Sequence, residues 1–450
     1  MTSKGLADTL LGYWRYLRSA GVSKFTHGRK CSNEKHLLLL AWEFPPVISG
    51  GVYRPMSFVR EGVRRGWKVT VAAGPVPSST SAVGSYLISQ LPAEVAIIRV
   101  RASSLTPSSR FFPHIDGGFV NISETLDAVL RATPSGVSAV LATGPMFHNF
   151  VAAEHLATHY KAPLILDYRD EWSDCPFAFV RKGNMDRYWE HYCLKRAHRV
   201  LFVTQSFAKQ SQCSFPDVDA SKFLVIPNGF ELSDVINRPE IPAQSPIDRA
   251  VTIAFLGNLS RHCPPDSLLN TLHDLFVKDP HLGHRINLLF VGAVRPAIKT
   301  FMQRHSLSHS IVFRDQVTKP EAFQIMKRAD GLLLINPPEL HRYLPGKLFD
   351  YLAADTPILV YGEGGEVAEV VKRLDAGYVV PTADRQTLHD ALLQIKGGKK
   401  QPATDLRVDW LRRHERSLIA ENLFTQIESI TISPRHVCNS ARDVLREPGP

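Results

Sequence analysis

Short apolar segments of strand length alternate with segments of helical periodicity along most of the 450-residue chain, and this alternation limits the possible folds more than any single motif. Strands that alternate with helices favour parallel sheets covered by helices on both faces. We therefore predict an α/β fold. The expected strands of the first half lie at residues 36–42, 68–73, 95–100, 139–142, 163–167, 200–204 and 223–226. Those of the second half lie at residues 251–256, 286–291, 311–314, 331–335, 357–361 and 377–380.

A segment that contains several prolines and no clear periodicity, residues 231–250, separates the two halves. Linkers between domains have this character. Two Rossmann-like domains joined in this way face each other across a central cleft, a preferred place for small ligands. Residues 75–118, rich in Pro, Ser and Gly, are expected to form a long loop around one strand. The expected parts are a basic N-terminal extension (1–35), a first Rossmann-like domain (36–240), a second one (241–404), C-terminal helices that cross back to the first domain (405–432), and a tail (433–450).

The overall charge of the chain points to anionic partners. The formal net charge is +10, which suits phosphates, nucleic acid or an acidic membrane surface. No nucleic-acid recognition motif accompanies this charge. The six cysteines are scattered and form no C-x-x-C pair, so we expect free thiols in a reducing compartment. The apolar runs are too short to span a bilayer, and no secretory signal precedes them, which favours a cytoplasmic protein.

The N-terminal extension has the pattern of a basic amphipathic helix. Leu6, Leu10, Trp14 and Leu17 fall at helical spacing, with several Arg and Lys residues nearby. Such a helix can lie on an anionic membrane, here the inner face, as a peripheral contact. The same apolar stripe is also typical of a helix that packs on the body of a protein.

Residues 344–354 predict a helix whose start suits an anion. Pro345 fits the first turn of a helix, where its missing N–H leaves no hydrogen bond unmade. The free N–H groups and the positive dipole end there attract negative charge. Lys347 and Asp350 are three residues apart and are expected to share one face. This start could offer a cation to phosphate and a carboxylate to a pair of hydroxyls, although a core helix with a surface ion pair has the same pattern.

Two strand ends in the first half carry further candidate residues. Gly50 and Gly51 follow the first strand in a strand–turn–helix–strand unit and let a ligand approach the backbone. The loop lacks the G-x-G-x-x-G fingerprint of dinucleotide cofactors. Residues 167–172 leave the carboxyl end of another strand, where α/β sheets place their ligands.

Six motifs in a fixed order connect these features to a known family. They are Phe44-Pro45-Pro46 with Gly50-Gly51, Thr143-Gly144-Pro145, Asp167-Tyr168-Arg169-Asp170-Glu171-Trp172, Ile226-Pro227-Asn228-Gly229, Phe255-Leu256-Gly257 and Pro345-Gly346-Lys347-Leu348-Phe349-Asp350-Tyr351. Their order and spacing resemble those of GT-B glycosyltransferases, especially the retaining family-4 group and its bacterial polysaccharide-type members. The resemblance covers residues 36–430 and implies a GT-B fold.

The resemblance implies roles for individual residues on the donor side. Asp350 matches the carboxylate, usually glutamate, that holds the ribose hydroxyls of a nucleotide donor, and Lys347 lies beside its diphosphate. Arg261 is the candidate for a second basic residue at the diphosphate, although the family more often has a Gly-Arg pair and a later lysine there. The remaining implied donor-binding residues are Gly50, Gly51, Gly257, Asn258, Pro345, Gly346 and Leu348.

The chain departs from the family at one acidic position. The family motif has two glutamates eight residues apart, and the residue eight before Asp350 is Arg342. Glu339 is three residues away and would need a local rearrangement to take the role of the first glutamate. The polysaccharide-type members often lack this glutamate too, so the departure is compatible with activity.

Three residues of the first half are further candidates. His148 matches a position where the family can present a polar side chain to the reacting sugar, and we count it, with Lys347 and Arg261, as catalytic. Its alternative is a structural histidine. Arg169 and Asp170 are candidates for the acceptor side, or else form a pair that stabilises their loop.

The resemblance predicts an enzyme that moves a sugar from a nucleotide-diphosphate sugar to an acceptor hydroxyl with retention of anomeric configuration. UDP-, GDP- and TDP-linked donors all fit, and a glycan, a lipid-linked or a small-molecule acceptor would serve polysaccharide, glycolipid or secondary-metabolite glycosylation. No carboxylate cluster suggests a metal, so we expect a metal-independent enzyme without a cofactor. A sugar-nucleotide epimerase on the same fold and a non-catalytic sugar-nucleotide-binding protein are the alternatives.

Overall fold

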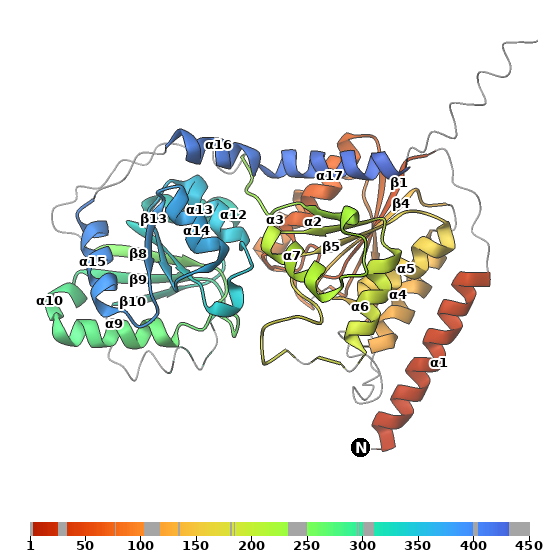
Figure 1. Ribbon diagram of the computed structural model, residues 1–450, viewed down its shortest axis with the longest axis horizontal. Coiled ribbons are helices and arrows are strands. Elements are labelled where there is room, and N and C mark those ends of the chain that lie inside the picture. The colour runs from red at the N-terminus through yellow and green to blue at the C-terminus, as the bar shows by residue number, and fades with distance from the viewer. Residues whose placement is uncertain are drawn as a thin grey trace, which may run out of the picture.

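The computed structural model describes most of the chain. The described residues are 3–25, 34–76, 78–102, 118–133, 136–180, 182–183, 185–232, 250–294, 296, 298, 300, 310–398 and 404–431. They form two α/β domains side by side, joined along one edge by the C-terminal helices (Figure 1). Most of the proline-containing linker, part of residues 75–118 and the whole tail (433–450) lie outside the described residues.

The first domain is built on a seven-stranded sheet in which all neighbouring strands are parallel. Its strands are β1 (His36–Ala41), β2 (Lys68–Ala73), β3 (Ala96–Arg99), β4 (Ala139–Thr143), β5 (Leu164–Tyr168), β6 (Arg199–Phe202) and β7 (Phe223–Val225). The strand order is β3-β2-β1-β4-β5-β6-β7, with Leu37 of β1 opposite Ala139 of β4. The order therefore reverses between β1 and β4.

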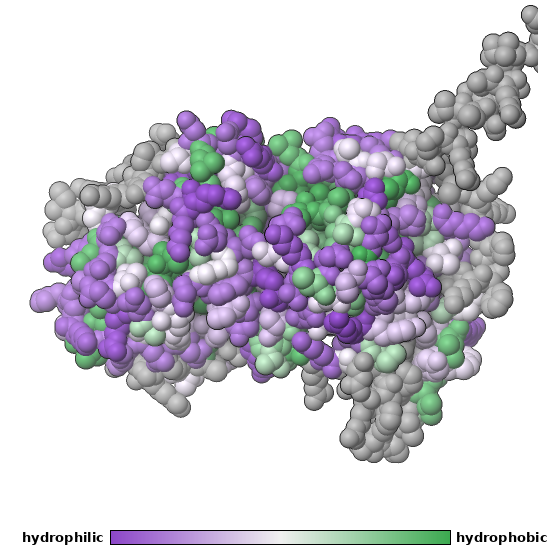
Figure 2. Space-filling model, viewed as in Figure 1, coloured by the Kyte–Doolittle hydropathy of each residue, from purple (hydrophilic) through white to green (hydrophobic). Residues whose placement is uncertain are grey.

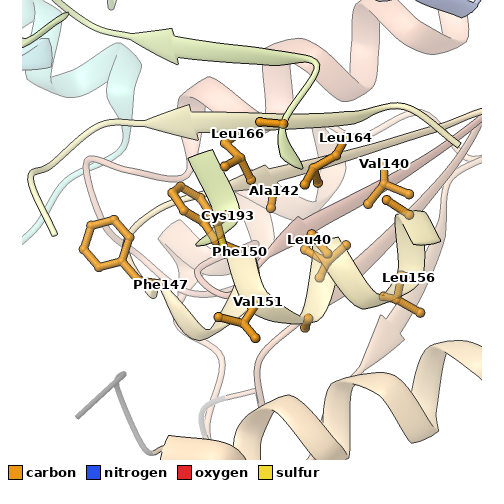
Figure 3. Packing of buried hydrophobic residues seen from close by; sticks show 14 of the residues in the cluster. Leu40, Val140, Ala142, Phe147, Phe150, Val151, Leu156, Leu164, Leu166 and Cys193 are labelled. Carbon is orange, nitrogen blue, oxygen red and sulfur yellow. The ribbon is translucent and has the colours of Figure 1, made fainter. Parts of the chain in front are cut away.

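Successive side chains along each strand point to opposite faces of this sheet, and a layer of helices covers each face. Leu38 and Leu40 of β1 face the core below α4 (Gly118–Ala132), α5 (His148–Tyr160) and α6 (Asp186–Arg196). Figure 3 shows side chains of α5 packed in this core beside Leu40. Leu37 and Leu39 face the opposite core, below α2 (Tyr53–Arg64) and the C-terminal helix α17 (Arg416–Thr431). The remaining helices of this domain are α1 (Ser3–Phe25), α3 (Ala82–Ser89), α7 (Gln205–Ser214) and the short 3-10 helix η1 (Ala220–Lys222).

The second domain repeats this topology with a six-stranded parallel sheet. Its strands are β8 (Val251–Leu256), β9 (Ile286–Val291), β10 (Ile311–Arg314), β11 (Gly331–Ile335), β12 (Ile358–Tyr361) and β13 (Gly377–Val380). Their order is β10-β9-β8-β11-β12-β13, so this sheet reverses its order between β8 and β11.

Helices cover both faces of the second sheet as well. On one face α9 (Asp266–Lys278) and α15 (Arg385–Lys396) pack on Ile253 and Phe255 of β8. On the other face α12 (Lys319–Arg328), α13 (Gly346–Ala354) and α14 (Gly365–Arg373) pack on Ala254 and Leu256. The remaining elements are α10 (Pro280–Gly283), the 3-10 helix η2 (Pro338–Leu340) and α16 (Asp405–Arg413).

The chain crosses between the domains at two places that lie together. Phe230, at the end of the first domain, donates its N–H to the carbonyl of His414 (3.2 Å) and accepts from the N–H of Arg416 (2.9 Å). Before this point α16 packs on α13 of the second domain, with Trp410 stacked on Phe349. After it, α17 lies on α2 of the first domain. The C-terminal helices therefore return to the first domain.

The α/β prediction is confirmed, and each of the expected strands is present within about two residues of its expected bounds. One helix was missed. The structure places α3 inside residues 75–118, where only a strand in a long loop was expected. Ser81 caps this helix by accepting from the N–H of Gly84. None of the described helices is long and apolar enough to cross a membrane.

Where the chain crosses between the domains, the segments around Gly229 and His414 approach so closely that position 229 requires a glycine. A Cβ at Gly229 would lie 2.3 Å from the carbonyl oxygen of His414. We expect Gly229→Ala to lower the free energy of unfolding by about 2 kcal/mol, since overpacking of this kind forces the backbone to shift. Urea unfolding measures the effect. In Gly21→Ala, the matched control, the added Cβ has no atom within 4 Å, and equal stability of the two variants would contradict the prediction.

Candidate functional site

The loops at the two points of strand-order reversal face each other between the domains. In parallel sheets of this kind ligands bind outside the carboxyl ends of the strands at such points. Several hydrogen bonds join the two edges. The Thr204 hydroxyl donates to the carbonyl of Arg342 (2.6 Å), the Asn228 amide to the carbonyl of Leu344 (3.1 Å), and the Tyr343 hydroxyl to the carboxylate of Glu171 (2.8 Å). The start of α13 therefore lies against the carboxyl edge of the first sheet.

A buried carboxylate, Glu171, holds this arrangement. It follows β5, and its side chain is only 1% exposed. The Arg342 guanidinium binds both carboxylate oxygens, at 2.6 and 2.9 Å. The hydrogen bond to Glu171 raises the pKa of Arg342. The arginine found where the family has its first glutamate thus forms an ion pair across the domain interface, together with Tyr343. We call Glu171, Arg342 and Tyr343 the interdomain clasp.

Arg169 connects two loops of the first domain. Its guanidinium donates to the carbonyl of Gly51 (2.5 Å) and to the carbonyl of Gly144 (2.5 Å). A Cβ at Gly51 would lie 2.2 Å from this guanidinium, so the glycine makes room for it. On the other side, Ser49 accepts from the Gly51 N–H (3.1 Å) and donates to Glu43 (2.6 Å). These contacts favour the loop-stabilising alternative for Arg169 over direct contact with an acceptor.

Asp170 remains open to solvent between the domains. Its side chain is exposed to solvent. The protein atoms around it reduce its hydration, and this desolvation raises the pKa of the carboxyl. The charges of Arg169 and His262 oppose this shift. His262 belongs to the loop after β8, and its ring contacts Phe177 and Phe179 from the loop after β5. Asp170 is therefore an accessible carboxyl that faces the second domain.

A buried ion pair lies beneath these loops. The Arg54 guanidinium, on α2, binds Asp167 at 2.7 Å, and both side chains are almost inaccessible. Arg54 also donates to the carbonyls of Ile226 and Pro227, at 2.8 and 2.6 Å. Thr143 donates to the second carboxylate oxygen of Asp167 (2.9 Å). Motifs that are distant in sequence are thus joined in one network, which sequence reasoning missed.

The start of α13 holds Lys347 over the end of β8. Pro345 precedes the helix and Gly346 is its first residue. The Lys347 ammonium lies 3.7 Å from the centre of the Phe255 ring. Gly257 has φ of 124° and leaves space there, because a Cβ on it would lie 3.1 Å from the ammonium nitrogen. Burial lowers the pKa of Lys347.

Asp350 has a different partner from the one its spacing suggests. The carboxylate is buried and binds the ammonium of Lys319, at the start of α12. The Lys319 nitrogen lies 5.0 Å from the centre of the Tyr53 ring, which belongs to the first domain. Lys347 and Asp350 thus turn to different surroundings and form no surface pair. Sequence reasoning missed Lys319, and its place 31 residues before Asp350 gave no signal.

The other candidate residues are spread around this centre. Arg261 and Asn258 are exposed in the loop after β8, where Asn258 accepts from the N–H of Ala293 (3.2 Å). Glu339 is exposed in η2. His148 is fully buried at the start of α5, edge-on to the Trp42 ring with centres 4.5 Å apart, as in the structural alternative. Within the described residues no three His, Cys, Asp or Glu side chains are grouped to hold a metal ion.

Two family models match the chain, one in each domain. The first is described as "Glycosyl transferase 4-like domain" and matches residues 49–229. The second, "Glycosyl transferases group 1", matches residues 250–396. The chain belongs to the GT-B glycosyltransferases of the family-4 type. The predicted family and its enzymatic class are therefore confirmed. A comparison with curated proteins found no match.

Solved structures with the same fold cover nearly the whole of this glycosyltransferase. Sucrose-phosphate synthase from Thermosynechococcus elongatus has a TM-score of 0.66 at 14% identity, over 88% of this chain and 99% of the other. HepE from Anabaena, in complex with UDP-glucose, has a TM-score of 0.62 at 14% identity, over 88% and 99%. WaaG, a glycosyltransferase involved in lipopolysaccharide biosynthesis, has a TM-score of 0.61 at 15% identity, over 88% and 100%. They confirm the GT-B fold.

The interdomain clasp gives a testable prediction. Arg342→Ala leaves the Glu171 carboxylate buried with the Tyr343 hydroxyl alone, and we expect it to lower the free energy of unfolding by about 2 kcal/mol. We also expect a larger radius of gyration by X-ray scattering, because the ion pair joins the domains. Arg385→Ala is the control, since the Arg385–Asp274 pair is about half exposed on both sides. If Arg342→Ala and Arg385→Ala matched in both measurements, the clasp would have no such role.

Proposed function

We propose that this glycosyltransferase transfers a sugar from a nucleotide-diphosphate donor to an acceptor hydroxyl with retention of anomeric configuration. The observation that carries the proposal is the position of the α13 start, which lies at the strand-order reversal of the second sheet and against the carboxyl edge of the first. Free N–H groups at a helix start bind phosphate. Lys347 in the same turn adds a cation.

The leaving diphosphate accounts for the unusual environment of Lys347. Cleavage of a sugar–diphosphate bond builds negative charge on the leaving oxygens, and fixed donors that meet this charge accelerate the step. Burial disfavours the Lys347 ammonium in the free protein. A diphosphate bound beside it would favour the charged form again. The leaving phosphate is proposed to help deprotonate the acceptor hydroxyl, as expected for the family.

On the nucleotide side we propose that Asp350 accepts hydrogen bonds from the ribose hydroxyls. Its carboxylate is bound to the Lys319 ammonium, which orients it. Gly50, Gly51 and Gly257 would let the donor approach the backbone, with Asn258, Leu348 and Arg261 around it. The proposed acceptor side includes Asp170, the accessible carboxyl on the first domain. Glu339 and His148 would need a rearrangement to reach a sugar, because one is exposed in η2 and the other fully buried.

The donor base, the acceptor and the location also belong to the proposal. UDP-linked sugars are the first donors to test, since the solved HepE structures contain UDP or UDP-glucose. We propose a metal-independent, cytoplasmic enzyme without a cofactor, acting in polysaccharide, glycolipid or secondary-metabolite glycosylation. Product analysis distinguishes transfer from epimerisation, which would yield an isomerised donor without acceptor, and from binding without turnover.

A thermal-shift series tests the donor site. We expect UDP-, GDP- or TDP-linked sugar to raise the melting temperature, because a ligand that binds the native state stabilises it. Asp350→Asn should weaken donor binding on the order of tenfold, through loss of a charged hydrogen-bond acceptor. Asp355→Asn, at the other end of α13, is the matched control; its left-handed backbone conformation suits asparagine. Equal donor affinity in the two variants would rule out the ribose role.

Lys347 should affect turnover and not folding. We expect Lys347→Met to lower kcat on the order of 100-fold, since one fixed donor to the leaving group is worth about 3 kcal/mol. The methionine retains an apolar chain over Phe255 and removes a charge that burial disfavours, so the melting temperature should not fall. Steady-state kinetics and thermal unfolding measure both quantities. Normal turnover with a lowered melting temperature would indicate a purely structural lysine.

A further inference from the structure

Among the described residues, one face of the N-terminal helix α1 packs on α4 and α5 of the first domain. Its Tyr16 hydroxyl shares a hydrogen bond with His155 of α5 (2.9 Å), and Ser19 donates to Asp127 of α4 (2.8 Å). Ala20 is buried on the same side. At Gly12 an added Cβ would lie 2.8 Å from the Val120 side chain, so the helix approaches α4 closely. This face fixes α1 to the first domain.

The outer face of α1 is apolar and exposed. Leu10, Trp14 and Leu17 follow one another at helical spacing and are 59%, 57% and 50% exposed. Leu11 and Tyr13 widen this surface. No other described helix exposes more than two large hydrophobic side chains. Figure 2 shows apolar residues on the outer side of α1, at the lower right. A helix that is apolar on two sides is typical of one lying between two apolar surroundings.

The basic sequence to which α1 belongs, together with Arg18 beside Trp14, indicates what covers this face. Residues 1–35 contain seven Lys or Arg and two Asp or Glu, which amounts to half of the net charge of +10. On α1 the Arg18 guanidinium lies 5.8 Å from the centre of the Trp14 ring, at the edge of the apolar surface. Leucines beside tryptophan, tyrosine and long cationic side chains make up helices that lie in the interface of an anionic bilayer. A second copy of this basic segment would meet like charge.

We propose that the outer face of α1, defined by Leu10, Leu11, Tyr13, Trp14 and Leu17 with Arg18, binds the surface of an anionic lipid bilayer. The helix lies flat, with the apolar side chains among the acyl chains and the cations at the headgroups. Because α1 is fixed to α4 and α5, the whole first domain is held at the membrane. This sharpens the peripheral contact expected from the sequence, while the binding itself does not depend on glycosyl transfer.

Co-sedimentation of the full chain with vesicles tests the proposal. We expect binding to vesicles that contain phosphatidylglycerol to exceed binding to pure phosphatidylcholine on the order of tenfold, given the contribution of each cation near an anionic surface. Combined Leu10→Ser, Trp14→Ser and Leu17→Ser should reduce binding at least about tenfold, since three apolar side chains no longer enter the bilayer. Arg18→Glu should also weaken it.

The matched control replaces three apolar side chains of similar exposure in the second domain. Val277→Ser, Val312→Ser and Leu393→Ser, which are 66%, 48% and 42% exposed in the parent chain, should leave vesicle binding unchanged. Equal binding by the α1 variant and the parent chain would overturn the proposal, as would equal losses in the α1 and control variants. A lipid-independent dimer that the α1 substitutions dissociate would instead identify a self-association surface and also overturn it.

Two further readouts separate this inference from the proposed function and from misfolding. Brominated phosphatidylglycerol should quench the tryptophan fluorescence of the parent chain, and Trp14→Phe should remove most of that quenching. The melting temperature, and any rise produced by a sugar nucleotide, should be the same in the α1 variant and the parent chain, because the substituted side chains are exposed and lie on α1. Undiminished quenching in Trp14→Phe would contradict insertion of this face.

Discussion

The ion pair between Glu171 and Arg342 is the interaction on which the functional region depends most. A carboxylate removed from water is strongly unfavourable unless charge and hydrogen bonds compensate it. Here the compensation comes from the other domain, through Arg342 and Tyr343. Since these two residues are separated from α13 only by Leu344 and Pro345, satisfying Glu171 also fixes the start of that helix against the first sheet. Arg342, which motif spacing predicts to stand in place of the family's first glutamate, therefore has a structural role in this chain.

The two charged residues near the start of α13, Lys347 and Asp350, have different neighbours. Lys347 points toward the aromatic ring of Phe255, whereas Asp350 binds Lys319 beside Tyr53 of the opposite domain. Among the described residues no carboxylate forms an ion pair with Lys347, and burial disfavours its charge. Such an environment suits a group whose counter-charge arrives with an anionic substrate. In the proposed function the helix start would offer that substrate N–H groups, while the buried Arg54–Asp167 pair joins the loops of the first domain.

The local sequence pattern was sufficient to predict the architecture, but it did not predict which side chains pair with each other. Strand positions follow from apolar segments between turns, so β1 and β8 were placed from sequence alone. Helix α3 was missed because Pro, Ser and Gly around it suggest a loop, and its start depends on the Ser81 cap. Position in a motif identified Asp350, yet its bond to Lys319 arises only when two helices pack together. The burial of His148 against Trp42 likewise depends on tertiary packing, which no local pattern records.

The paired chain crossings at Phe230 and Glu415 have a mechanical consequence. Backbone hydrogen bonds hold Phe230 against residues 414–416, so a rotation of one domain relative to the other would have its axis near this crossing. Hydrogen bonds close to such an axis persist during rotation, while contacts far from it separate. The carboxyl edges of the two sheets would then move apart as the domains rotate about that axis. The tight fit of Gly229 beside the carbonyl of His414 keeps the two chain segments in register at this crossing.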